Sequence, residues 1–418
     1  MGSDMVVALK EASANGASLF GLNHYTDSDR QQAVHLVPGQ MHDLGEVSHT
    51  SHLALPQVRQ TFSVLGVQSI DRWGFTHGVN EHRVTIGITD WKSRLPAGSA
   101  VLTGPELVRL ALERSRGAHQ AVEVLTDLLE RHGHGESTAH GTNDHIFLIA
   151  DASEAFVLET AGRYWALLEC GSTRAVTDVA MIRQDWRRLA PGLASFVIEQ
   201  GWTQDDGSKI DFVRCLGENP GQTKDAQKRW GRASLALAQQ QGAIDLHYLR
   251  RMLAEHYFEN RDILPVSNTA LMSSFLTDLH KTDQPTLAWV AFGSPKVALY
   301  FPLCLVGELP TAFTECTATS IPQRMQDLQK MAQTRDRTKL PAILERLQTK
   351  FDQDAEDFVA RAHDYAQHGK PYLIGQVATE MMEHHVELFD TEYRRLFGME
   401  ERTPHRIPEV EEEVLFFA

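Results

Sequence analysis

Twenty histidines stand in this chain of 418 residues, and their imidazoles are suited to acid–base or metal chemistry. His77 and His82 flank Asn80, and a glycine-rich stretch over residues 132–140 holds three more. A metal site needs neutral imidazoles that converge from different elements, usually with a carboxylate. None of the histidines has a recognised metal-binding spacing such as H-E-x-x-H. We interpret the 132–140 stretch as a solvated loop and expect no cofactor.

Cysteine count and net charge exclude two classes of protein. Forty Lys and Arg residues against 55 Asp and Glu residues give a formal charge of −15, which is unfavourable for binding a phosphate backbone. The cysteines form no CxxC pair, so neither a disulfide scaffold nor a cysteine metal site is expected. The four are Cys170, Cys215, Cys304 and Cys316.

The N-terminal segment MGSDMVVALKEASANG does not resemble a secretory signal, because no basic region precedes an apolar one. Val6 stands where N-myristoylation requires Ser or Thr. No run of 18 apolar residues is long enough to span a bilayer. We therefore expect a cytoplasmic protein with neither a membrane nor a nucleic-acid partner.

The elements that would position functional residues follow from the hydrophobic pattern. Apolar runs predict strands, and Asn15-Gly16 is a hairpin turn signal between the first two. Thr103 is a plausible helix N-cap, with Pro105 and Glu106 in the first turn. Strands are expected at 5–9, 18–21, 62–65, 84–88, 146–150, 155–158, 164–168, 287–291 and 297–301, and helices from 103, at 117–129, 227–240 and 246–255.

Strands, then a helical hairpin, then more strands predict a layered core rather than an alternating βαβ fold. From about residue 321 to 397 the sequence becomes helical and charged, which indicates a C-terminal helical extension. We expect a domain over residues 1–318 and the helical extension over 319–418. His384 and His385 in this extension are expected at the surface.

Four blocks of sequence occur in the order that is typical of one enzyme group. Residues 3–9 read S-D-M-V-V-A-L, and residues 19–23 read L-F-G-L-N. Residues 73–82 read W-G-F-T-H-G-V-N-E-H, and residues 147–165 contain F-L-I-A-D followed by E-T-A-G-R-Y-W. The chain resembles the secernin and dipeptidase-A group of the N-terminal-nucleophile (Ntn) hydrolases, within the clan of choloylglycine hydrolase and penicillin acylase. The match covers residues 3–170 well and 170–315 loosely.

This resemblance implies an α+β fold, an αββα sandwich of two antiparallel sheets between helical layers. It places Ser3 at the position of the family's nucleophilic cysteine. The residue there attacks an amide carbonyl after the chain before it is removed, and its free α-amine acts as the base. Asn80 and Asn23 match family asparagines, and Asn80 would stabilise the oxyanion. The implied substrate is a dipeptide or another small amide.

The sequence departs from the family at several of these positions. In the ungapped register His24 replaces a Ser and Tyr25 replaces the Asp that helps to position the amine. A gapped register would use Ser28-Asp29-Arg30 instead. His145 stands where a second oxyanion Asn is expected. A natural Ser3 and an engineered Cys→Ser replacement look the same in the sequence.

We favour an amide hydrolase that processes its own N-terminus, with Ser3, Asn80, Asn23, Tyr25 and His145 as catalytic candidates. The substrate-facing candidates are His24, Trp73, His77 and Glu81. The alternative is a repurposed or catalytically silent member whose pocket, formed by His24, Tyr25 and His145, binds a small molecule or a metal. A homo-oligomer formed through the C-terminal helices is a further expectation.

Overall fold

The structure is a computed structural model. It describes residues 2–26, 31–95, 102–138, 141–218, 224–258, 271–280, 284–332 and 340–399. The strands are β1 (Gly2–Ala8), β2 (Leu19–Thr26), β3 (Gln32–Val37), β4 (Val47–His49), β5 (Ala54–Pro56), β6 (Val64–Ser69), β7 (His77–Asn80), β8 (Thr85–Trp91), β9 (Glu136–Thr138), β10 (Gly141–Ala150), β11 (Ala155–Ala161), β12 (Tyr164–Glu169), β13 (Thr173–Val176), β14 (Arg188–Leu189), β15 (Leu271–Asp278), β16 (Leu287–Phe292) and β17 (Phe301–Cys304).

The helices flank these strands, and the last four follow them in the chain. They are α1 (Gly104–Arg114), α2 (Ala118–His132), α3 (Leu193–Glu199), α4 (Phe212–Leu216), α5 (Lys224–Gln239), α6 (Leu246–Phe258), α7 (Thr311–Thr314), α8 (Ile321–Ala332), α9 (Leu340–Gln367) and α10 (Tyr372–Leu396).

Two antiparallel sheets form the centre of the molecule. The six-stranded sheet has the order β13-β1-β2-β15-β16-β17, so the N-terminal strand is an internal strand. The larger sheet runs β14-β12-β11-β10-β8-β7-β6-β3, with β9 paired to β10. The hairpin predicted at Asn15-Gly16 joins β1 to β2, with Gly16 at a φ of 72° and the Asn15 side chain accepting a hydrogen bond from the Ala17 amide.

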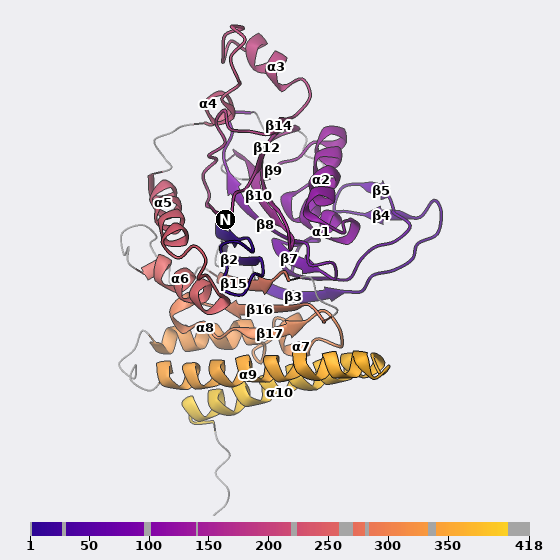
Figure 1. Cartoon of the computed structure of the whole chain (residues 1–418), viewed down its shortest axis with the longest axis vertical. Helices are drawn as coiled ribbons and strands as arrows, with labels where there is room; N and C mark the ends of the chain where they lie inside the picture. The colour runs from indigo at the N-terminus through magenta and orange to yellow at the C-terminus, as the bar shows by residue number, and fades with distance from the viewer. Residues whose placement is uncertain are drawn as a thin grey trace, which may run out of the picture.

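The two sheets face each other, because β1 contacts β8 and β15 contacts β7. Helices α1 and α2 cover the far side of the larger sheet, and α5 and α6 cover the far side of the smaller one (Figure 1). Thr103 and Glu106 form the predicted N-terminal cap of α1 as a capping box. The four layers confirm the αββα sandwich. We call the side of each sheet that faces the other sheet its inner face, and the helix-covered side its outer face.

The C-terminal helices pack against the edge of the smaller sheet. Helix α8 contacts β16, while α9 and α10 lie side by side and contact β17 (Figure 1). Their apolar residues, such as Phe351 and Phe389, belong to the same hydrophobic cluster as the sheets. The domain boundary at 318/319 stays a prediction, as does oligomerisation through these helices. His385 is buried against Phe351 and Asp354, contrary to its predicted surface position, whereas His384 is exposed.

One predicted strand is displaced along the chain. Residues 295–297 form a short 3-10 helix, and the strand runs from Phe301 to Cys304 rather than over 297–301. Pro295 has no amide hydrogen to give to a ladder and starts the 3-10 turn instead. Pro302 is tolerated because β17 is an edge strand. No helix of the described residues is long and apolar enough to span a membrane.

Candidate active site around Ser3

Ser3 lies on the inner face of β1, enclosed between the two sheets and without solvent exposure. Its hydroxyl donates to the Ile88 carbonyl oxygen at 2.6 Å and lies 2.8 Å from His24 Nδ1. Its backbone nitrogen donates to Thr89 Oγ1 at 2.8 Å. Strand β2 supplies His24 because Ser3 and His24 are register partners, and the facing strand β8 supplies the other two groups. The hydroxyl and the nitrogen of Ser3 are therefore both held in place.

These contacts determine the tautomer of His24. A hydroxyl has one proton, and that of Ser3 is committed to the Ile88 carbonyl. The short contact to His24 Nδ1 is then a hydrogen bond only if Nδ1 carries a proton and donates to Ser3 Oγ. Burial lowers the pKa of His24 to about 4, so the ring is neutral near neutral pH. Nε2 is consequently an unprotonated acceptor.

His77 repeats this arrangement on the facing sheet. Thr76 donates its hydroxyl proton to the Val67 carbonyl at 3.2 Å, so His77 Nδ1, 3.1 Å away, donates to Thr76. Burial lowers the pKa of His77 well below its ordinary value. The rings of His24 and His77 have centroids 5.9 Å apart. Both Nε2 atoms are buried and have no hydrogen-bond partner among the described residues, and the same holds for the hydroxyl of Ser273, the register partner of His24.

Asn23 and Tyr25 lie on the outer face of β2, because side chains alternate along a strand. The Asn23 amide donates to the Leu253 carbonyl of α6 at 3.0 Å and accepts from Ser274 Oγ at 2.6 Å. Asn23 thus joins the strand to the helical layer. Its side chain does not share a face with the Ser3 hydroxyl.

Tyr25 belongs to a buried ionic cluster with Asp4, Asp178 and Arg229. The Arg229 guanidinium donates to Tyr25 Oη and to Asp4 Oδ1, both at 3.1 Å, and also pairs with Asp178. Burial raises the pKa of Tyr25 well above its ordinary value, and the carboxylates of Asp178 and Asp4 add to the effect. Tyr25 is therefore a neutral phenol that cannot replace the charge of the family's Asp.

The Asn80 side chain is held by hydrogen bonds to backbone groups around the β7–β8 turn. Its amide nitrogen donates to the carbonyls of Leu112 and Ser115 at 2.8 and 2.7 Å, at the end of α1. Its oxygen accepts from the amides of His82 and Val84, both at 3.0 Å. The side chain therefore closes the β7–β8 turn and has no spare donor for a substrate oxygen.

His145 belongs to a different cluster from His24, on the outer face of the larger sheet. Its Nε2 lies 3.2 Å from Asp90 Oδ1 and its Nδ1 3.0 Å from His134 Nε2. Its ring packs on the first residue of α1, where a Cβ on Gly104 would come within 2.6 Å of it. His134 is 4% exposed, so the solvated loop predicted for 132–140 is wrong there. The positive φ of Gly133 lets the chain turn inward after α2. His140 lies outside the described residues.

The remaining predicted residues lie around α1 and its neighbouring loops. Trp73 is half-buried beneath the Arg109 guanidinium at 4.4 Å, and Glu81 is exposed and accepts from the Ser63 amide at 3.1 Å. Ser28, Asp29 and Arg30 of the gapped register lie outside the described residues.

Four residues of the site were not predicted from the sequence: Thr89, Ser273, Arg229 and Asp178. They carry no local signal, because each reaches the site only through the pairing of distant segments.

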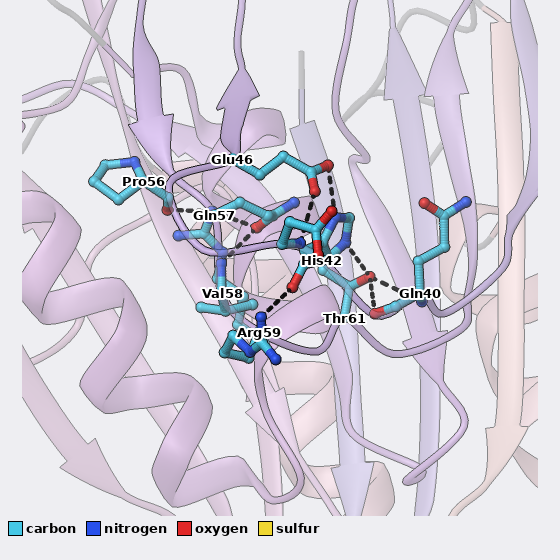
Figure 2. Close-up of polar contacts among 10 residues, drawn as sticks. Gln40, His42, Glu46, Pro56, Gln57, Val58, Arg59 and Thr61 are labelled. Atoms are coloured by element: carbon cyan, nitrogen blue, oxygen red, sulfur yellow. Dashed lines mark hydrogen bonds and ion pairs between the residues drawn. The ribbon is translucent and has the colours of Figure 1, made fainter.

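Another hydroxyl–imidazole contact lies at the base of the β4–β5 hairpin. His42 Nδ1 lies 2.8 Å from Glu46 Oε1 and its Nε2 3.1 Å from Thr61 Oγ1 (Figure 2). The Asp43 amide also donates to Glu46, and Arg59 donates to the His42 carbonyl at 3.0 Å. We call His42, Glu46 and Thr61 the arm cluster. These bonds connect the two chain segments that lead into and out of the hairpin.

A pocket of about 380 Å³ opens elsewhere on the molecule, and Ser3 does not line it. It lies between α2 and the β12–β14 edge and is lined by Glu123, Thr126, Asp127, Glu130, Trp165, Arg188, Leu189 and Pro191. Within the described ranges, no group of three or more His, Cys, Asp or Glu side chains is arranged to hold a metal ion.

No protein-family model matches the sequence. Among solved structures, a mutant of conjugated bile acid hydrolase from Clostridium perfringens is 11% identical with a TM-score of 0.44, over 73% of this chain and 92% of that one. A second variant of that enzyme is 12% identical with a TM-score of 0.42, over 72% and 92%. The Caenorhabditis elegans ortholog of N-acylethanolamine-hydrolyzing acid amidase is 10% identical with a TM-score of 0.33, over 67% and 94%. Similarity this distant assigns neither a reaction nor a substrate to the chain.

Proposed function

We propose that this protein is an N-terminal-nucleophile hydrolase that cleaves the C–N bond of a dipeptide or another small amide, with Ser3 as nucleophile. One observation supports this most directly. Ser3 lies at the start of an internal strand of an αββα sandwich, with its hydroxyl and its nitrogen both held on the inner face. This is the arrangement that a nucleophile needs when its own α-amine is the base.

The free amine arises by self-cleavage in this proposal. Ser3 Oγ attacks the carbonyl carbon of Gly2, the Gly2–Ser3 C–N bond breaks, and the hydroxyl proton goes to the Ser3 nitrogen. Water then hydrolyses the ester and releases Met1-Gly2 as a dipeptide acid. The α-amine has an ordinary pKa near 8, so a neutral fraction is present at cellular pH to accept the hydroxyl proton in later turnovers.

Two neighbours then support Ser3 in turnover. Thr89 Oγ1 accepts a hydrogen bond from the Ser3 nitrogen, which orients the amine. Neutral His24 donates from Nδ1 to Ser3 Oγ and adds no positive charge beside the amine. Asn80, whose amide protons are used by backbone carbonyls, has no role in this mechanism.

Intact-mass measurement and N-terminal sequencing of the purified protein test this function. We expect the mature chain to begin at Ser3, and the Ser3→Ala variant to keep Met1-Gly2 or to lose only Met1. A wild-type chain that keeps Gly2 has no α-amine at Ser3 and contradicts the proposal.

A second candidate function is a catalytically silent protein that binds a small ligand or a metal ion. It is favoured by the closed Ser3 and by the three unpartnered groups of His24, His77 and Ser273. Two acceptor nitrogens next to a hydroxyl suit a group that offers hydrogen-bond donors, or a cation that takes imidazole ligands. Metal analysis and native mass spectrometry of protein purified without an affinity tag decide this, because a chain free of bound metal and ligand argues against it.

A further inference from the structure

Gly2 lies directly against the ring of Tyr25. A Cβ built on Gly2 would lie 2.3 Å from Tyr25 Oη, 2.4 Å from Cζ and 2.5 Å from Cε2. Separations this short are incompatible with van der Waals contact, so any larger residue would force the ring to move. The φ of Gly2 is not positive, so space and not backbone conformation requires glycine here.

The Tyr25 ring has little freedom to give way. Its hydroxyl accepts a hydrogen bond from Arg229 at 3.1 Å, and Arg229 is held by Asp4 and Asp178. The Arg229 side chain is 4% exposed, so a displaced Tyr25 would disturb a buried ion pair. The ring is therefore a rigid wall beside the Gly2 α-carbon.

The residue that touches this wall is the acyl residue of the self-cleavage step. The ester formed when Ser3 Oγ attacks Gly2 is a Met-Gly ester of Ser3. The same covalent species forms when the mature enzyme attacks an external Met-Gly amide. The α-carbon of that acyl group is the Gly2 α-carbon, and beside it the Tyr25 ring leaves space for a hydrogen atom but not for a Cβ.

Resting on the proposed function, we propose that Tyr25 is a specificity-determining residue that restricts the enzyme to amides whose acyl α-carbon is unbranched, such as glycyl or acetyl amides. An L-alanyl or larger aminoacyl amide places a Cβ against the ring. Tyr25 does not take part in the chemistry of this step. It selects the acyl group by its shape, and Arg229 is a positioning residue that holds the ring.

A matched pair of fluorogenic substrates tests this selection: glycyl and L-alanyl amides of the same coumarin leaving group. For the wild-type protein we expect kcat/KM to favour the glycyl amide by about tenfold or more, the range in which one misplaced methyl is discriminated. Tyr25→Phe removes the hydroxyl and its bond to Arg229 but keeps the ring, whose Cζ and Cε2 still stand against an added Cβ, so most of the preference persists. Tyr25→Ala removes the ring, and the ratio falls toward one through faster hydrolysis of the alanyl amide.

Self-cleavage gives a second measurement that needs no external substrate. Gly2→Ala is expected to slow the loss of the first two residues, followed by intact mass over time. Adding Tyr25→Ala restores the rate, whereas adding Tyr25→Phe does not. Thermal unfolding of each variant separates slow cleavage from failure to fold.

The possible failures are distinguishable. A wild-type chain that never loses Gly2 overturns the proposed function, and this inference with it. A chain that is cleaved but hydrolyses both amides at similar kcat/KM overturns the inference alone. The inference also fails if Gly2→Ala is cleaved as fast as the wild-type chain, or if Tyr25→Phe relaxes the preference as much as Tyr25→Ala.

Discussion

The Ser3 site and the arm cluster both join a hydroxyl to an imidazole at hydrogen-bond distance, 2.8 Å in one and 3.1 Å in the other. In both, the hydroxyl donates to a backbone carbonyl: Ser3 to Ile88 at 2.6 Å and Thr61 to Gln40 at 3.4 Å. The two imidazoles differ in the partner of Nδ1. His24 Nδ1 faces the Ser3 hydroxyl, whereas His42 Nδ1 faces the Glu46 carboxylate.

Judged by side-chain contacts alone, the arm cluster is closer to a hydroxyl–histidine–carboxylate triad than the Ser3 site is. The surroundings reverse that ranking. Glu46 is 47% exposed, and the arm bonds connect two loop segments, whereas Ser3 is enclosed between two sheets beside the N-terminal bond. A hydroxyl–imidazole distance therefore identifies a candidate, and the burial of the hydroxyl and its place in the chain decide between a structural link and a reactive group.

The largest difference between the two regions should appear in function. Ser3→Ala is expected to abolish self-cleavage and amide hydrolysis, because it removes the nucleophile. Thr61→Ala, the matched change in the arm cluster, should leave both unchanged. Intact mass and a glycyl-coumarin assay give the readout. Loss of hydrolysis in Thr61→Ala with retained activity in Ser3→Ala would reverse the assignment of the two regions.

Stability should separate the regions next. Arg229→Met leaves the carboxylates of Asp4 and Asp178 beside Tyr25 without their guanidinium, which should cost about 3–5 kcal/mol in the free energy of unfolding. Arg59→Met removes an exposed hydrogen bond to the His42 carbonyl and should cost about 1 kcal/mol or less. Urea unfolding measures both. Similar losses in the two variants would mean that the Arg229 cluster is not a buried support of the site.

As the pH falls, the free energy of unfolding should decrease through the buried histidines before the arm cluster is affected. The folded pKa of His24 is about 4 against an ordinary 6.5, so between these values the unfolded chain binds a proton that the folded chain does not. Stability from this group is present above pH 6.5 and is lost as pH falls toward 4, by about 1.4 kcal/mol for each pH unit of the interval.

His24→Asn should therefore flatten the pH dependence of unfolding between pH 6.5 and 4, although His77 and His134, also lowered by burial, keep part of it. The control is Thr61→Ala, which removes no ionisable group and should leave the dependence as in the wild-type protein. A wild-type stability that is constant over this interval would contradict the buried, neutral state of His24.

The smallest effect concerns the charge of the arm cluster. The hydrogen bond from His42 lowers the pKa of Glu46, with the Asp43 amide contributing. His42→Ala should raise this pKa toward its ordinary value, as followed by NMR titration of the carboxyl carbon. Thr61→Ala, which leaves Nδ1 in place, serves as the control. An unchanged Glu46 pKa in His42→Ala would show that the arm cluster does not form in solution.

Local pattern was sufficient to predict much of the fold. The apolar runs around residues 5–9, 84–88 and 146–150 are strands, and the Thr103–Glu106 cap begins α1, because periodicity and capping act within a few residues. The order of strands and helices predicted a layered core, and the family resemblance implied the αββα arrangement of its layers. The strand expected at 297–301 was displaced, because Pro295 begins a 3-10 turn that runs to Val297.

The site could be predicted only in part. Ser3 and His24 do lie together, and His77 lies beside His24. Thr89, Ser273 and Arg229 join them from segments 86, 270 and 226 positions away from Ser3 in the chain, by subtraction of the residue numbers. A single sequence contains no measure of such pairings.

The hydrophobic pattern alone was enough to locate most of the strands, and the family resemblance implied two sheets and drew attention to Ser3. The face on which each neighbour of Ser3 lies became known only from the folded chain. Asn23, His24 and Tyr25 are consecutive, yet side chains alternate, so His24 faces Ser3 while the other two face the helices. Register and burial depend on strand pairing across the whole chain, and they determine the hydrogen-bond partners and the protonation state of each side chain.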